Sequence, residues 1–181
     1  MARVPYVARE DLPDDQQRHY DDISNARGGR MANVFSLLLN APDLAGRIGN
    51  VGAYLRFASQ IPDDAREITI LTTAFEMKCQ YEFTHHVPIA QRAGVRDEVI
   101  QGITSRSNRG LLPKESVFID YARKVVNNKV DDATYAAIEH LLGRQGAVEI
   151  TVVAGYYSML AHSMLALGVE LEENVAPLMP A

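Results

Sequence analysis

The chain has 181 residues, of which 47% are hydrophobic and 23% charged, and its formal net charge is −5. These values are typical of a soluble protein large enough to bury a substantial core. The acidic balance, with no clustered basic face, argues against nucleic-acid binding. Polar residues interrupt the apolar stretches before the roughly 20 residues of a membrane span, so no membrane partner is expected. The single cysteine, Cys79, excludes an internal disulfide. Together with the lack of a signal-like N-terminus, it favours the cytoplasm.

The chain is expected to consist of an N-terminal arm, residues 1–30, and one helical domain, residues 31–181. Prolines, an acidic run and a glycine pair interrupt the arm, in which only residues 16–23 favour a short helix. From residue 32 onward, apolar residues recur at the 3.6-residue helical period and no alternating strand pattern is found. The fold class is therefore predicted to be all-α.

The expected helices are separated by clear stop and start signals. Pro42 is expected to end the first of them, with Asp43 capping the next, and Gly94 is expected to stop the fourth in a left-handed conformation. Pro113 suits the first turn of a later helix. The helices expected from this pattern span residues 32–39, 44–60, 65–75, 79–92, 96–104, 114–127, 133–142 and 147–167.

The last expected helix, residues 147–167, is the most apolar segment. Its apolar surface is too wide for a helix that lies on the outside of a monomer. We therefore expect it to be central or buried against another subunit, and the protein to be a homo-oligomer.

The densest set of reactive side chains lies in residues 76–86. On a helix with about 100° per residue, His86 lies about 20° from Cys79 and about 40° from Glu82 in azimuth. All three side chains are therefore expected on one face. Glu82 and His86, at i and i+4, form a candidate acid–base pair, and burial is expected to raise the pKa of Glu82.

Structural interpretations of these residues are also open. A Glu–His pair at this spacing is common on solvated helices, and a single cysteine is often a small buried apolar residue. His85 points about 100° away from His86 and suits packing or capping. Because neighbouring histidines diverge on a helix, Glu82, His85 and His86 make a poor metal site. We expect neither a metal nor a cofactor.

Glu67 is a further candidate, although it lies 12 positions before Cys79. In one straight helix the two residues would be about 18 Å apart. Glu67 joins the site only if the chain turns back between Phe75 and Cys79, where there is no glycine or proline to indicate a turn.

These residues resemble a known superfamily. Arg66-Glu67, Cys79 and His86 are similar to the Glu and the Cys-x-x-Cys-x-x-x-His segment of alkyl hydroperoxidase D, but Glu82 stands in place of the second thiol. The Glu-x-x-x-His spacing from Glu82 to His86, followed by Gly94, resembles the carboxymuconolactone decarboxylase branch. The resemblance covers roughly residues 30–175. It implies a helical bundle of the alkyl hydroperoxidase D-like type, assembled as a trimer or hexamer.

The resemblance implies a cofactor-independent lyase or isomerase in aromatic-acid catabolism. The expected reactions are decarboxylation, double-bond shift or cis–trans isomerisation of a small carboxylated, conjugated compound. Glu82 and His86 would transfer protons, Glu67 would orient His86, and Cys79 would contact the substrate. One cysteine cannot complete a two-thiol peroxidase cycle. A single-cysteine peroxidase resolved by an external thiol is the second hypothesis, and a non-catalytic helical oligomerisation module is the third.

A carboxylated substrate requires a cation and neighbouring polar groups. Arg30, Arg56 and Arg66 are the candidates for the cation, and the sequence does not rank them. Tyr81 and His85, which flank the acid–base pair, complete the expected substrate-binding set.

Overall fold

The computed structural model describes residues 1–180, which form two compact units. Unit 1 contains residues 1–58 and 163–175, and unit 2 contains residues 59–162 and the segment from residue 176 onward. Within the described residues the elements are a 3-10 helix and eight α-helices, with no strand. The all-α prediction is confirmed. The predicted boundary after residue 30 stays a prediction.

Unit 1 is built on two helices that approach each other closely. Its elements are η1 (Arg9–Asp11), α1 (Gln17–Asn25), α2 (Asn33–Leu38) and α3 (Pro42–Phe57). A Cβ added to Gly46 would lie 2.5 Å from His19 Nδ1, and one added to Gly49 would lie 2.7 Å from Ile23 Cγ1. The two glycines of α3 therefore allow α1 to pack against it.

The helix before Pro42 ends as expected, at Leu38, and Ala41 is non-helical (φ −132°, ψ 79°), but the expected cap at Asp43 is wrong. Pro42 is the first residue of α3, Ala41 is the N-cap, and Asp43 lies in the first turn instead of capping the helix. The reason is that the first helical position needs no N–H partner and suits the fixed φ of proline. A carboxylate in the first turn still stabilises the helix through its dipole.

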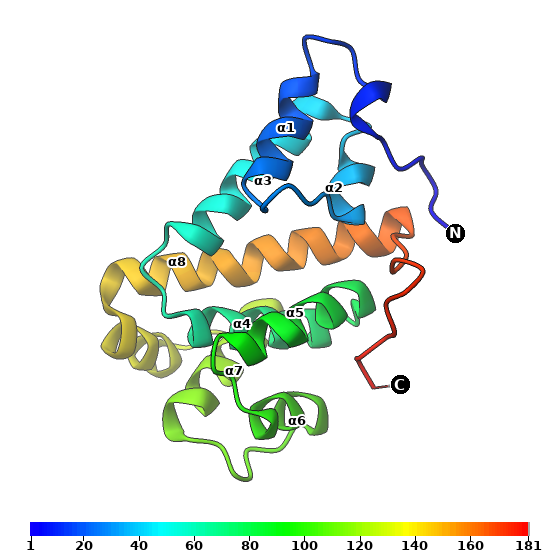
Figure 1. The fold of residues 1–181 in the computed structure, drawn as a ribbon. Coiled ribbons are helices and arrows are strands. Elements are labelled where there is room, and N and C mark those ends of the chain that lie inside the picture. Colours follow the sequence, from blue (N-terminus) through cyan, green and yellow to red (C-terminus); the bar gives the residue numbers. More distant parts are fainter. Residues whose placement is uncertain (181) are drawn as a thin grey trace. The chain divides into compact units, whose positions relative to one another are not determined.

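Unit 2 is organised around one buried helix. Its elements are α4 (Asp63–Glu76), α5 (Gln80–Arg92), α6 (Asp97–Ser105), α7 (Pro113–Val126) and most of α8 (Asp132–Leu167). Helix α4 packs against α5, α6 and α7 (Figure 1). Every residue from Ala65 to Ala74 is buried, the polar ones included. Thr69 and Thr72 satisfy their hydroxyls within the helix by donating to the carbonyls of Ala65 and Ile68.

The chain turns back between α4 and α5, as required for Glu67 to join the site. Lys78 adopts a left-handed conformation with φ 55°. The N–H of Cys79 donates to the carbonyl of Ala74 (2.9 Å), and that of Lys78 to the carbonyl of Phe75 (3.0 Å). This pattern is a Schellman-type helix end, in which a lysine occupies the position usually taken by glycine.

We expect the variant Lys78→Gly to unfold at a higher urea concentration than the wild type. The left-handed conformation costs an ordinary residue about 1–2 kcal/mol, which glycine avoids. Lys78→Val should lower the free energy of unfolding, because a β-branched residue tolerates this conformation least. Lys129→Gly is the control, because Lys129 is exposed and has no positive φ. A loss of stability in Lys78→Gly would contradict this interpretation of the turn.

Helix α8 was expected as two helices separated by a turn at residues 143–146. The break is confined to Gly143, with φ 68° and ψ 175°, after which the helix continues through Gly146. Figure 1 shows the resulting change of direction between the first, yellow part of α8 and its long continuation. Glycine adopts this backbone conformation without steric cost.

By length and composition α8 could cross a membrane, and 44% of its most apolar window is buried inside the protein. Polar residues such as Glu149 and Thr151 interrupt this helix, as expected, and the absence of a membrane partner stays a prediction. The core helix of a soluble protein passes the same test.

Candidate functional site

The centre of the candidate site is a carboxylate–imidazole pair that joins α4 to α5. His86 Nδ1 lies 2.7 Å from Glu67 Oε2. Glu67 is fully buried and His86 is 7% exposed. The hydrogen bond to the carboxylate assigns the proton to Nδ1, which leaves Nε2 as the basic nitrogen. The prediction that Glu67 lies within hydrogen-bond reach of His86 is confirmed.

Arg66 supports the buried carboxylate. Its Nε lies 3.5 Å from Glu67 Oε1, and another guanidinium nitrogen lies 2.8 Å from Asp63 Oδ1. The arginine is itself 7% exposed. A cation at this distance offsets the desolvation cost of a buried negative charge. Two carboxylates of α4 therefore pair with Arg66. This favours a role in stabilising Glu67 over a role in binding a substrate carboxylate.

Tyr157 of α8 fixes the plane of the His86 ring. The two rings meet edge to face, with centroids 5.1 Å apart and an interplanar angle of 89°. Tyr156 packs against Tyr157 in the same manner at 5.4 Å. Sequence reasoning placed Tyr157 in the apolar pattern of the last helix, within a segment that also resembles the family. That pattern carries no signal that distinguishes a tyrosine beside the site from any other core residue.

Glu82 is the second carboxyl group of the site and differs from Glu67 in its surroundings. It lies in the first turn of α5, one turn before His86, and is 5% exposed. Its Oε2 is buried without a hydrogen-bond partner. Desolvation raises the pKa of Glu82 well above its ordinary value, as expected. The raised pKa favours the neutral acid, which is the form that can donate a proton.

The two carboxyl groups therefore differ in role. His86 Nδ1 takes Glu67 as its partner, in keeping with the orienting role expected of Glu67. The i,i+4 spacing keeps Glu82 and His86 on one face of α5. The site thus combines a carboxylate-supported imidazole with a separate neutral acid one helical turn away.

Cys79 does not belong to the helical face on which it was placed. It is the N-cap of α5, with an extended backbone (φ −92°, ψ 91°), because the chain is still leaving the turn. Its side chain is 1% exposed. Desolvation, followed by the charge of Glu82, raises the pKa of the thiol to about 12, although the N–H groups of Tyr81 and Glu82 act in the opposite direction. At neutral pH the sulfur is a thiol, a poor nucleophile.

The expected substrate-binding residues lie in both units. Tyr81 and His85 contact each other on α5, with ring centroids 4.4 Å apart. Arg30 is an exposed residue of unit 1. The guanidinium of Arg56, also in unit 1, lies 5.1 Å from the ring centroid of Phe57. Their roles in substrate binding stay predictions.

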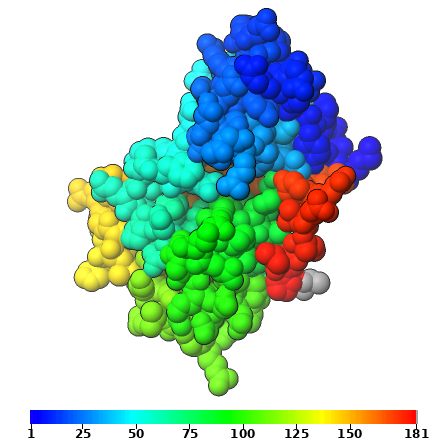
Figure 2. Space-filling model, in the orientation of Figure 1, coloured from blue at the N-terminus to red at the C-terminus, as the bar shows by residue number. Residues whose placement is uncertain are grey.

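The C-terminal segment is tied to α5. The backbone N–H of Leu178 donates to Thr84 Oγ1 at 3.0 Å. Figure 2 shows the last, red residues running beside the green surface of α5. Residues more than 90 positions away in the sequence thus contribute to the surroundings of the helix that carries Glu82 and His86.

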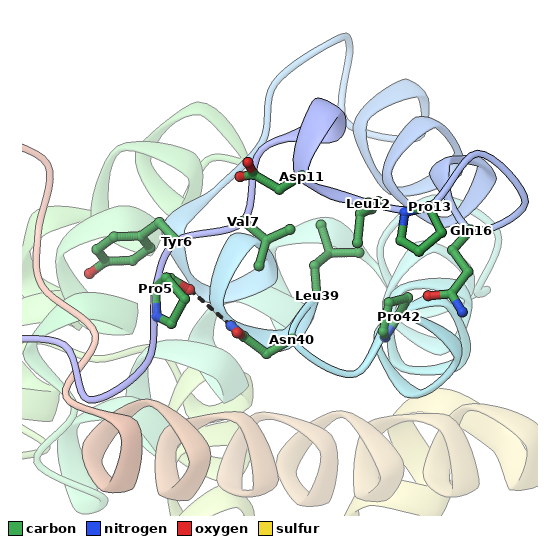
Figure 3. Close-up of a pocket in the computed structure, with 10 residues that line it drawn as sticks. All are labelled: Pro5, Tyr6, Val7, Asp11, Leu12, Pro13, Gln16, Leu39, Asn40 and Pro42. Atoms are coloured by element: carbon green, nitrogen blue, oxygen red, sulfur yellow. Dashed lines mark hydrogen bonds between the residues drawn. The ribbon is translucent and has the colours of Figure 1, made fainter.

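A groove of about 510 Å³ lies in unit 1 (Figure 3). Its walls include Leu12, Leu39 and three prolines, and the Asn40 amide donates to the carbonyl of Pro5 at 2.9 Å. None of the candidate catalytic side chains lines it. In residues 1–180 no group of three or more His, Cys, Asp or Glu side chains is arranged to hold a metal ion.

No protein-family model and no curated protein matches the sequence. Solved structures of similar fold include the following three. An uncharacterized peroxidase-related protein with an alkylhydroperoxidase AhpD core, from Ralstonia eutropha JMP134, has a TM-score of 0.77 at 18% identity. The match covers 95% of this chain and 93% of that one.

The other two structures are of the debrominase Bmp8. The apo form gives a TM-score of 0.72 at 16% identity and covers 92% of this chain and 90% of that one. A cysteine-to-alanine variant in complex with 2,3,4-tribromopyrrole gives 0.74 at 15%, covering 96% and 95%. The chain therefore has the alkyl hydroperoxidase D-like helical fold that its motif residues predicted.

Proposed function

We propose that the protein is a cofactor-independent lyase or isomerase that acts by acid–base chemistry on a small carboxylated, conjugated compound. The observation that carries the proposal is the His86–Glu67 hydrogen bond of 2.7 Å, one helical turn from a second buried carboxyl group, that of Glu82, whose Oε2 has no hydrogen-bond partner. A base and an acid with different surroundings are what two linked proton transfers require. The Bmp8 debrominase, which shares this fold, is a further enzyme with a small unsaturated ring compound bound in its variant structure.

In an isomerisation, His86 Nε2 removes a proton from carbon and the electron pair of that C–H bond moves into the conjugated system. Glu67 stabilises the imidazolium that forms. The neutral Glu82 carboxyl then protonates a remote carbon, which moves the double bond. The proton gained by His86 returns to Glu82 and completes the cycle.

In a decarboxylation, the electrons of the bond to the carboxylate enter the conjugated system as carbon dioxide leaves. Protonation by Glu82 follows at the remote carbon, and a proton from solvent restores the acid. Both reactions generate a dienolate, and a neutral acid held out of water is suited to protonate it.

Ring-fission products of aromatic acids are the substrates that we propose, with Arg30, Tyr81 and His85 as the binding residues. A homo-oligomer, trimeric or hexameric, in the cytoplasm remains our proposal for the assembly and its location.

The test is a screen of ring-fission acids as substrates. Turnover is measured by the loss of diene absorbance and by NMR of the products. Cys79→Ser should retain a substantial part of the activity, because the wild-type thiol is buried and neutral. The wild type should not reduce organic hydroperoxides with dithiothreitol. Peroxide turnover that Cys79→Ser abolishes would establish the single-cysteine peroxidase instead. No turnover of any acid or peroxide would favour the non-catalytic oligomerisation module.

A further inference from the structure

Residues 177–180, which we call the strap, form no helix or strand and are held against α5 through their backbone. The N–H of Leu178 donates to Thr84 Oγ1 at 3.0 Å. The Leu178 side chain is 49% exposed, so the contact does not depend on burying it. Helix α5 therefore holds the strap by its main chain.

The side-chain amide of Gln80 completes this contact. Its oxygen accepts from the N–H groups of Leu178 and Met179 at 3.1 and 2.9 Å, and its nitrogen donates to the carbonyl of Met179 at 3.3 Å. The hydrogen-bond network sets this orientation of the amide, because the Thr84 hydroxyl also donates to the amide oxygen, at 2.9 Å. Gln80 and Thr84, one helical turn apart, thus form a polar clamp on the strap.

The composition of the strap suits this clamp. Its first and last residues are Pro177 and Pro180, neither of which has an N–H group. The backbone donors of the strap are therefore those of Leu178 and Met179, and the clamp accepts hydrogen bonds from both. Proline also restricts the free chain, which lowers the entropy cost of holding the segment in one conformation.

The first two turns of α5 need support from outside the helix. Their N-cap is Cys79, whose sulfur accepts hydrogen bonds more weakly than the usual hydroxyl or carboxylate. Pro88 lies inside the helix and has no N–H to donate to the carbonyl of Thr84, four residues earlier. The turns that carry Glu82 and His86 thus lie between a weak cap and a gap in the helical hydrogen bonds.

The clamp lies on the side of α5 away from the candidate site. At about 100° per residue, Gln80 is about 200° from Glu82 in azimuth, and Thr84 is about 200° from His86. Glu67 of α4 therefore contacts α5 on one side, while the strap contacts it on the other. With the strap in place the Thr84 side chain is 2% exposed.

We propose that the strap fixes the first two turns of α5 against α4, with Gln80 and Thr84 as positioning residues for the Glu82 and His86 side chains. Without the strap, these turns would open locally while the rest of unit 2 stayed folded. The proposal concerns the geometry of the site and does not depend on the reaction proposed for it. Its tests therefore use no substrate.

The variant Leu178→Pro tests the strap by removing one of its N–H groups. Hydrogen exchange of the α5 amides at residues 83–87 should become about tenfold faster, because local opening of a helix exposes its amides to solvent. Leu178→Ala is the matched control, since it keeps the N–H and alters only an exposed side chain. The amides of α7, in the same unit, should exchange as in the wild type.

Two results of this exchange experiment would overturn the proposal. One is an unchanged exchange rate of the α5 amides in Leu178→Pro, or an equal effect of Leu178→Ala. The other is an equal acceleration in α7, which would show that the strap stabilises unit 2 as a whole and has no particular effect on α5.

The variant Thr84→Val tests the clamp from its other side, because it removes the hydroxyl and keeps the shape of the side chain. The His86 ring N–H that faces Glu67 should give a downfield proton NMR signal in the wild type. This signal should broaden in Thr84→Val through faster exchange with solvent, and Thr84→Ser, which restores the hydroxyl, should restore it. A sharp signal in Thr84→Val, or its loss in Thr84→Ser, would exclude the positioning role.

Discussion

The variant His86→Ala is expected to lower kcat of the proposed reaction by about 10²–10⁴-fold, the usual effect of losing an acid–base group. The loss should appear in kcat more than in KM, because Nε2 acts on the reacting proton. Glu67→Gln should give a smaller loss, since the ring keeps a hydrogen-bond partner but loses the charge that stabilises its protonated form. Steady-state kinetics of both variants on the same substrate measures these effects.

The double variant His86→Ala/Glu67→Gln decides whether the pair acts as a unit. Once His86 is absent, the loss of the Glu67 charge should matter little, so the double variant should be about as slow as His86→Ala alone. His85→Ala is the comparison variant, and as a proposed binding residue beside Tyr81 it should raise KM more than it lowers kcat. If His85→Ala abolished turnover while His86→Ala retained most of it, the assignment of the basic histidine would be wrong.

Glu82→Gln is expected to reduce kcat by about 10²–10⁴-fold while it stabilises the protein at neutral and alkaline pH. The amide has the size of the neutral acid but cannot donate the proton that the reaction requires. The same substitution should raise the free energy of unfolding, because the wild-type protein keeps a carboxyl group in surroundings that disfavour its ionised form.

The pH dependence of this stability difference follows from the raised pKa of Glu82. In the unfolded chain a glutamate ionises near its reference pKa of about 4.3. The folded protein holds the proton to higher pH, so its relative stability falls as the pH rises above that value. Below pH 4 the carboxyl group is protonated in both states and the wild type has no such disadvantage.

Urea unfolding at pH 4 and pH 8 measures this difference. The excess free energy of unfolding of Glu82→Gln over the wild type should be larger at pH 8. Glu173→Gln, at an exposed position of unit 1, should show no such change. A Glu82→Gln protein that is less stable than the wild type at pH 8 would contradict the neutral-acid assignment.

The helical architecture could be predicted from the sequence because apolar periodicity and punctuation agree along most of the chain. Gly94 has φ 86° after α5, and Pro113 is the first residue of α7, as expected. Asp131 accepts a hydrogen bond from the Thr134 N–H at the start of α8, as a capping residue should. The breaks at Pro42 and Gly143 were predicted, but the helices that follow them begin two to three residues earlier than expected, because proline suits a first helical turn and a single glycine suffices for the second break.

The candidate site was predicted less completely, since its geometry depends on packing between helices. The turn at Lys78 has no sequence signal, because a lysine occupies the left-handed position. Periodicity could place Glu82 and His86 on one face but could not show that Glu67 arrives from α4 to take Nδ1. The ion pair between Arg66 and Asp63 could not be predicted either, because it depends on where α4 begins. Cys79 was expected to be the first residue of the helix that carries His86. Helix α5 begins one residue later, at Gln80, so Cys79 is its N-cap.

The burial of α4 on all sides has a consequence for how the protein loses function on heating. Amides in a fully enclosed helix exchange with solvent only when the whole cooperative unit opens. Glu67 belongs to this helix, so the orientation of His86 should persist until unit 2 unfolds. The temperature of inactivation should therefore coincide with that of global unfolding, and a folded but inactive intermediate should not accumulate.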